Sequence, residues 1–121
     1  MPKGRPKHAA ASARELHVGR AVFMLRRAQE LDQAALARQA KVASDTLGRL
    51  ERAEVSPSLS SLFRVADGLG LSLVAVMLAA ELVEQKGAKW LLRRLRGLEA
   101  QAVEDKIAAA SKVRGLRGDD D

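Results

Sequence analysis

Apolar residues between positions 31 and 51 recur at the spacing of one helical face, with a single interruption. From residue 34 to residue 40 they lie three and four positions apart, and Leu47 and Leu50 repeat this spacing after a polar break. Asp32 precedes the first run and is a favourable N-cap residue. Two helices this short are not stable alone in water, so other helices must pack against them. The pattern predicts a helix-turn-helix held by a small helical bundle.

The same periodicity continues on both sides of this pair. Leu16, Val22 and Leu25 form the predicted buried stripe of the first helix, and Phe23 and Phe63 are candidate additions to the core. The predicted helices cover residues 14–29, 33–40, 44–52, 60–69, 73–85 and about 88–113. We therefore expect an all-α fold, a five-helix bundle with one extra amphipathic helix. The predicted division is a basic arm (1–13), a helix-turn-helix domain (14–85), and a docking helix with a frayed acidic end (86–121).

Two apolar surfaces have no cover in this prediction. The fifth helix is apolar almost all round, so only one of its faces can close the bundle. The last helix carries a partial heptad, and its opposite face is basic. An uncovered apolar strip favours a partner, which can be a second copy, the tail of the chain or another protein. The residues expected at this dimer or docking surface are Met77, Leu78, Trp90, Leu91, Leu95 and Leu98.

Composition narrows the class of protein. Hydrophobic residues make up 47% of the chain but only three of them are aromatic, which favours packed helices built from Leu, Val and Ala. Cysteine is absent, which excludes disulfides and fits a reducing cytoplasm. The longest apolar run, residues 73–80, is far below the roughly 20 residues needed to span a bilayer. We expect a soluble cytoplasmic protein, associated with the nucleoid and not with a membrane.

Positive charge is concentrated at the two ends of the chain. Residues 1–30 carry seven Lys or Arg against two acids, and residues 86–118 carry nine against three. Residues 31–85 carry five against seven, so the central motif is slightly acidic. If the partner is a polyanion, much of the electrostatic attraction is expected from the flanks.

A series of short motifs runs in order along residues 16–77. They are Val18-Gly19, Val22-x-x-Leu25-Arg26, Leu31-Asp32-Gln33-x-x-Leu36-Ala37, Leu47-x-Arg49-Leu50-Glu51-Arg52, Ser56-Pro57-Ser58-Leu59 and Leu69-Gly70-Leu71-Ser72-Leu73. In this order and spacing they resemble the Cro/phage-repressor, xenobiotic-response-element type of helix-turn-helix domain. The resemblance implies a homodimeric repressor that binds double-stranded DNA at a two-fold symmetric operator. It also implies a structural ion pair between Arg26 and Glu51.

In this interpretation the third helix enters the major groove and reads bases. Leu47 and Leu50 face the core, which leaves Ser44, Asp45, Thr46, Gly48 and Arg49 on or near the outer face. The predicted base-reading residues are Ser44, Asp45, Thr46 and Arg49, with Arg49 suited to a bidentate contact with guanine. For Asp45 three roles are open: contact with cytosine, orientation of Arg49, or simple interaction with the helix dipole. The predicted DNA-backbone residues are Gln33, Lys41, Arg52 and Ser58.

The turn between the second and third helices departs from the family pattern. Lys41 stands where a left-handed glycine is usual, and Ala43 stands where a capping Ser or Thr is usual. Ser44 is an alternative cap, which would start the third helix one residue later. The first helix similarly ends with Glu30 in place of glycine. The register of the reading residues is therefore open at this stage.

The N-terminal residues suggest a minor-groove arm. Lys3, Arg5 and Lys7 surround a Gly-Arg-Pro core similar to that of an AT-hook, an extended peptide suited to A·T-rich DNA. The alternative is a plain basic tail. No catalytic motif, cofactor or metal site is expected, because His8 and His17 lack metal-ligand partners at helical spacing. The leading function is transcriptional regulation, and the alternative is an antitoxin-type or adaptor protein that works through protein contacts.

Overall fold

A computed structural model describes residues 12–112, which form seven α-helices and no strands. The helices are α1 (Ala13–Ala28), α2 (Gln33–Ala40), α3 (Ser44–Glu51), α4 (Leu59–Leu69), α5 (Leu73–Lys86), α6 (Ala88–Leu95) and α7 (Ala100–Lys112). The predicted all-α class is confirmed. The first five helices begin and end within one residue of the predicted bounds. The single C-terminal helix is wrong, because two helices stand in its place.

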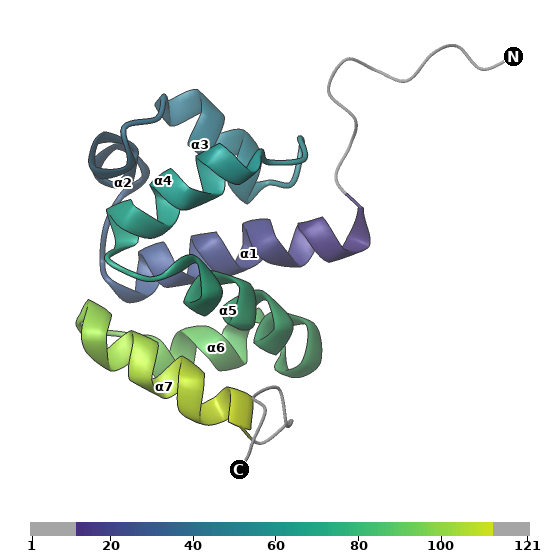
Figure 1. The fold of residues 1–121 in the computed structure, drawn as a ribbon, viewed down its shortest axis with the longest axis vertical. Helices are drawn as coiled ribbons and strands as arrows, with labels where there is room; N and C mark the ends of the chain where they lie inside the picture. Colours follow the sequence, from purple (N-terminus) through teal and green to yellow (C-terminus); the bar gives the residue numbers. More distant parts are fainter. Residues whose placement is uncertain (1–11, 113–121) are drawn as a thin grey trace, which may run out of the picture.

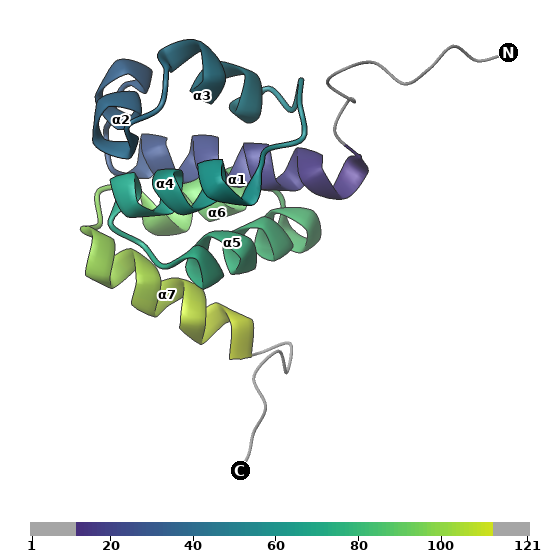
Figure 2. The same cartoon turned by 45° about the horizontal axis from the view of Figure 1, so that its top comes forward.

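Helix α1 runs through the middle of the molecule and contacts α3, α4, α5 and α6. Figures 1 and 2 show α2 and α3 on one side of α1, and α6 and α7 on the opposite side. Helix α4 packs against α2, and α5 packs against α1, α6 and α7. The helix-turn-helix and the tail are therefore separated by the body of the bundle.

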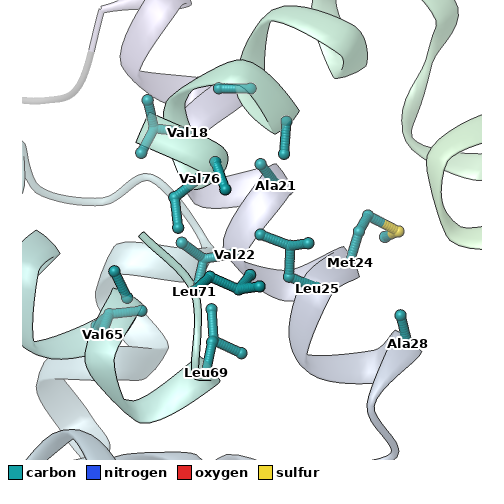
Figure 3. Close-up of a cluster of buried hydrophobic side chains, with 14 of the residues drawn as sticks. Val18, Ala21, Val22, Met24, Leu25, Ala28, Val65, Leu69, Leu71 and Val76 are labelled. Atoms are coloured by element: carbon teal, nitrogen blue, oxygen red, sulfur yellow. The ribbon is translucent and has the colours of Figure 1, made fainter. Parts of the chain in front are cut away.

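The core is aliphatic, as the composition predicts. Val22 and Leu25 of α1 are 0% exposed and lie close to Leu69 of α4 and Leu71 of the following loop (Figure 3). Two predicted core assignments are wrong. Leu16 is 38% exposed and Phe63 is 51% exposed, because both side chains lie at the edge of the bundle where no neighbouring helix covers them.

Three helices end in the same way, although none of them ends in glycine. Glu30, Lys41 and Ala53 have φ values of 60°, 60° and 58° and follow α1, α2 and α3. Each terminus has the paired backbone hydrogen bonds of a Schellman motif, for example Glu30 N–H to Arg27 O at 2.9 Å and Leu31 N–H to Arg26 O at 3.1 Å. Glu30 and Lys41 thus take the left-handed conformation that the family pattern assigns to glycine.

The tail breaks between α6 and α7 at Gly97. This residue has a φ of 79°, and its N–H donates to the carbonyl oxygen of Ala28 at the end of α1 (2.8 Å). The break lets α7 turn back and pack on α5, which buries Leu82 to 2% exposure. The tail of the same chain therefore packs on the second apolar face of α5, which was one of the three partners expected for it.

This packing corrects the predicted docking surface. Leu91 and Leu95 are 1% and 2% exposed in the core of their own chain, so they are not available to a partner. Trp90 and Leu98 are half-buried against the same core. Met77 is 40% exposed, and Leu78 beside it is half-buried. Of the apolar residues expected at an interface, Met77 is the most accessible.

Candidate nucleic-acid interface

The register of α3 is settled by its first residues. Ala43 is the N-cap, with a φ of −70° and no side-chain hydrogen bond, and Ser44 is the first helical residue. The alternative in which Ser44 caps the helix is therefore wrong. Lys41 takes a left-handed conformation and makes the tight turn possible without glycine. Leu47 and Leu50 are 0% and 2% exposed, so their burial fixes which face of α3 points outward.

All four predicted base-reading side chains lie on the exposed surface of α3: Ser44, Asp45, Thr46 and Arg49. The Arg49 side chain is 48% exposed, and its Nε lies 3.3 Å from Asp45 Oδ2 one helical turn earlier. This contact agrees with the role of Asp45 in orienting Arg49. A surface pair of this kind stabilises the helix only slightly, so its main effect is on side-chain direction.

Gly48 does not lie on the outer face, which corrects its expected position. It is buried, and a Cβ added there would lie 3.0 Å from Arg52 Nη1 and 3.4 Å from Gln33 Oε1. The missing side chain leaves room for Gln33 and Arg52 to lie across α3. Gly48 therefore accommodates neighbouring side chains and does not bring its own backbone to a ligand.

A buried ion pair fixes α3 to the rest of the bundle. Arg26 Nε and Nη2 donate to the two carboxylate oxygens of Glu51 at 2.8 and 3.0 Å, and the side chains are 8% and 3% exposed. Arg26 Nη1 also donates to the Leu31 carbonyl oxygen at 2.9 Å, and Gln33 Nε2 donates to Glu51 Oε1 at 3.0 Å. The pair expected from the resemblance is present and connects α1, α2 and α3.

Two glycines allow close helix contacts on either side of α2 and α3. A Cβ at Gly19 of α1 would overlap the Leu50 carbonyl oxygen of α3. A Cβ at Gly68 of α4 would lie 2.9 Å from the backbone nitrogen of Ala40 in α2. Because both obstacles are backbone atoms, any larger residue must displace a helix. The position of the helix-turn-helix is thus fixed from two directions.

The predicted backbone-contacting residues differ in how free their side chains are. Lys41 is exposed, and Ser58 is exposed at the N-terminus of α4, where its Oγ accepts from Ser61 N–H at 3.0 Å. Gln33 is half-buried and already donates to Glu51. Arg52 is exposed but its Nε lies 2.6 Å from Glu54 Oε2. Of these four residues, Lys41 and Ser58 can bind an anion without losing a side-chain contact to another element. Gln33 would have to release Glu51, and Arg52 would have to release Glu54.

The Arg52–Glu54 contact shifts both titrations. The hydrogen bond from Arg52 holds the pKa of Glu54 below its usual value, and the same bond raises the pKa of Arg52. Glu54 therefore remains ionised at neutral pH and competes with any other anion for Arg52. Sequence periodicity gives no signal of this pairing, because Glu54 lies beyond the end of α3.

Sequence reasoning also missed two residues next to these side chains. Arg64 of α4 is exposed, and its Nη1 donates to the Lys41 carbonyl oxygen at 3.4 Å. Ser61 lines a groove of about 180 Å³ together with Thr46, Arg49 and Ser58. Their signal in the sequence was a polar residue on the exposed side of the fourth predicted helix, which is not specific.

The predicted basic flanks fall in two different places. Lys3, Arg5 and Lys7 lie outside the described residues. Arg93, Arg94 and Arg96 are exposed, but they belong to α6 and the turn after it, across the bundle from α3 (Figures 1 and 2). Arg93, Arg94 and Arg96 therefore do not add their charge to the surface formed by α2 and α3 of the same molecule, which corrects that expectation for these three residues; Arg114 and Arg117 lie outside the described residues.

Glu15 connects α1 to the loop before α4. It accepts from Ser12 N–H at 2.9 Å in a capping box, and Ser56 Oγ donates to it at 2.9 Å. The Ser12 N–H, followed by the Ser56 hydroxyl, lowers the pKa of this carboxyl. The loop that carries Ser56 and Ser58 is thereby attached to the first helix.

Comparison with known proteins agrees with this geometry. A family model described as helix-turn-helix matches residues 23–76, a little under half of the chain. No curated protein and no solved structure gave a match. Among residues 12–112 no single helix is long and apolar enough to cross a membrane. Helices α4 and α5 reach the necessary length and apolar character only when taken together, and they are bent by 95° relative to each other.

Proposed function

Because residues 23–76 carry a helix-turn-helix domain of the Cro/phage-repressor type, a family typically without catalysis, we propose that this chain is a sequence-specific regulator of transcription. Double-stranded DNA is its partner, and α3 enters the major groove. The observation that carries the proposal is the grouping of Ser44, Asp45, Thr46 and Arg49 on the exposed face of an otherwise buried helix. The protein acts in the cytoplasm, where its DNA is.

Arg49 is the principal reading residue in this proposal. Its guanidinium can donate to O6 and N7 of guanine, and Asp45 at 3.3 Å limits the directions it can take. Ser44 and Thr46 reach neighbouring bases or phosphates. Each good bidentate contact is worth about 1–3 kcal/mol of discrimination between bases.

Phosphates are contacted along the edges of the helix-turn-helix. Lys41 and Ser58 are exposed there, and the N-termini of α2 and α4 present backbone N–H groups that attract an anion. Gln33 and Arg52 also contact phosphate. To do so, Gln33 releases its hydrogen bond to Glu51, and Arg52 releases its ion pair with Glu54. Lys3, Arg5 and Lys7 extend the contact into the minor groove of adjacent A·T-rich sequence.

The protein represses as a homodimer on a two-fold symmetric operator, with recognition helices about 34 Å apart. The supporting observation is a mainly apolar groove of about 550 Å³ between α1 and α5. Val18, Val74, Met77 and Leu78 are among its lining residues, together with the charged residues Arg14, Glu15, Glu81 and Glu84. Val74 is 66% exposed and Met77 40% exposed. Met77→Glu should lower the dimer fraction in sedimentation, whereas Phe63→Glu, on an exposed residue outside this groove, should not.

The second candidate function is an antitoxin-type or adaptor role based on protein contacts. It is favoured by the acidic balance of residues 31–85, five basic residues against seven acids. Selection of bound sequences from random DNA separates the two functions. DNA binding predicts one enriched motif and affinity that falls steeply with salt, whereas the adaptor role predicts neither. Arg49→Ala should remove the base preference at one position of the enriched motif. An unchanged motif would show that Arg49 does not read a base.

A further inference from the structure

The side of the bundle opposite α3 also carries a concave surface. A groove of about 460 Å³ opens between α5, α6 and α7, and three cationic side chains converge on it: Lys86, Arg94 and Lys106. Its walls also include Leu82, Trp90 and Ala110, and no carboxylate from residues 12–112 lines it. A smaller recess of about 30 Å³ leads from the same residues to Ile107. The groove thus combines positive charge with an apolar floor.

Two of the three cations of this groove, Lys86 and Arg94, lie against an aromatic ring. Arg94 Cζ lies 4.8 Å and Lys86 Nζ 5.6 Å from the centroid of the Trp90 ring. Within residues 12–112 no carboxylate forms an ion pair with Lys86, Arg94 or Lys106. A cation–π contact fixes the position of a cation without neutralising its charge. Lys86 and Arg94 are therefore positioned by Trp90, and no carboxylate of residues 12–112 neutralises them or Lys106.

The size and chemistry of the groove determine the class of ligand. Small-molecule sites are mostly apolar clefts of about 300–1,000 Å³ with a few convergent polar groups, and this groove fits that description. A stable protein partner needs about 800 Å² of surface on each side, which a groove bounded by single turns of three helices does not offer. A flat apolar body would lie against Trp90 and Leu82, and an acidic group would meet Arg94 and Lys106.

We propose that the α5–α6–α7 groove binds a small aromatic carboxylate. This site is independent of the DNA-reading surface and does not rest on the proposed function. Both parts of the ligand are needed: the carboxylate replaces the missing acid partner, and the ring covers the apolar floor.

The full-length chain provides its own reporter, because Trp90 is the only tryptophan. Its indole N–H gives one resonance, which can be followed by NMR while 2-naphthoate is added. We expect a saturable shift with 2-naphthoate. Inorganic phosphate and 2-naphthylmethanol, which lack the ring and the charge respectively, should bind at least tenfold more weakly.

Variants test the assigned cations. Arg94→Gln and Lys106→Gln should each weaken 2-naphthoate binding at least threefold, whereas Arg93→Gln, which removes the same charge from the neighbouring exposed residue outside the groove, should not. Circular dichroism checks that each variant is folded. If Arg94→Gln does not fold, Lys106→Gln alone tests the assignment of the cations. The proposal is overturned if 2-naphthoate causes no shift at millimolar concentration or if phosphate binds equally well. Equal binding of 2-naphthylmethanol, or an equal loss in Arg93→Gln, would also overturn it.

Discussion

Arg26 and Glu51 form a two-point ion pair between the first and third helices, with N–O distances of 2.8 and 3.0 Å in a nearly solvent-free position. Buried pairs of this type add little net stability, because removing both charges from water costs about as much as their attraction returns. Their geometry is nevertheless strict, since each hydrogen bond has one favourable direction. The pair therefore restricts the orientation of α3 relative to α1.

Removing one member of this pair should be far more damaging than replacing both. Glu51→Gln leaves a buried guanidinium without its charge partner and should lower the free energy of unfolding by about 3–5 kcal/mol in urea titration. The double variant Arg26→Met with Glu51→Leu should regain most of that loss. A double variant as unstable as Glu51→Gln would mean that hydrogen bonds to Leu31 and Gln33, and not the ion pair, dominate.

The left-handed residues at the helix ends should be sites where glycine stabilises. Ala53 has a φ of 58°, a conformation that costs a residue with a side chain about 1–2 kcal/mol. Ala53→Gly should raise the free energy of unfolding by about 0.5–1 kcal/mol after the larger entropy loss of glycine is subtracted. Ala34→Gly, on the exposed face of α2, is the control and should lower it by about 1 kcal/mol. A decrease for both variants would contradict this account of the helix end.

Freeing Arg52 should strengthen DNA binding. In Glu54→Gln the 2.6 Å ion pair is lost, so that Arg52 no longer has to exchange a carboxylate for a phosphate. We expect Kd to fall about three- to tenfold in a gel-shift titration, with a steeper dependence on salt. Glu99→Gln removes the same charge from the turn before α7 and should change Kd much less. Equal effects would point to net charge and not to Arg52.

The stability of the chain should decline in acid partly because of Glu15. Its pKa is lowered in the folded state, chiefly by the Ser12 N–H and then by the Ser56 hydroxyl. The contribution is therefore present above the unfolded pKa, about 4.3, and disappears as the pH falls through the lower folded pKa. Glu15→Gln should lower the Tm at pH 7 and have a smaller effect at pH 3. Ser56→Ala should show the same trend with a smaller amplitude, and a pH-independent difference would contradict it.

The tail should be required for folding. Truncation after Gln85 removes Leu91, Leu95, Val103 and Ile107, each at most 2% exposed. Burial of each such side chain contributes about 1.5–3 kcal/mol, so the combined loss is comparable to the 5–15 kcal/mol stability of a typical domain. Circular dichroism should show a largely unfolded product. A truncated chain that unfolds cooperatively near the Tm of the full chain would mean that the tail is only an appendage.

Local signals explain why the first five helices could be predicted. Asp32 and Ser72 cap their helices as expected, since their side chains accept from Ala35 and Ala75 N–H at 2.7 and 3.1 Å. The exposed face of α3 could also be predicted, because burial of Leu47 and Leu50 determines it. These features depend on residues a few positions apart.

The remaining features depend on contacts between distant residues. The spacing of Leu91, Leu95 and Leu98 continues across the break at Gly97, which is fixed by a hydrogen bond to Ala28. The inward position of Gly48 depends on the side chains of Gln33 and Arg52. Neither contact leaves a periodic trace in the sequence, so neither could have been found there.

The hydrogen bond from Gly97 to Ala28 has a consequence for engineering with this protein. The family match ends at residue 76. The carbonyl oxygen of Ala28, in the last turn of α1, accepts from the N–H of Gly97, which lies more than twenty residues beyond the end of that match. The matched segment, residues 23–76, is therefore shorter than the part of the chain that packs together in the structure. A chimaera that transplants this helix-turn-helix onto another protein should carry residues 12–112 together, with the fusion joint placed outside them.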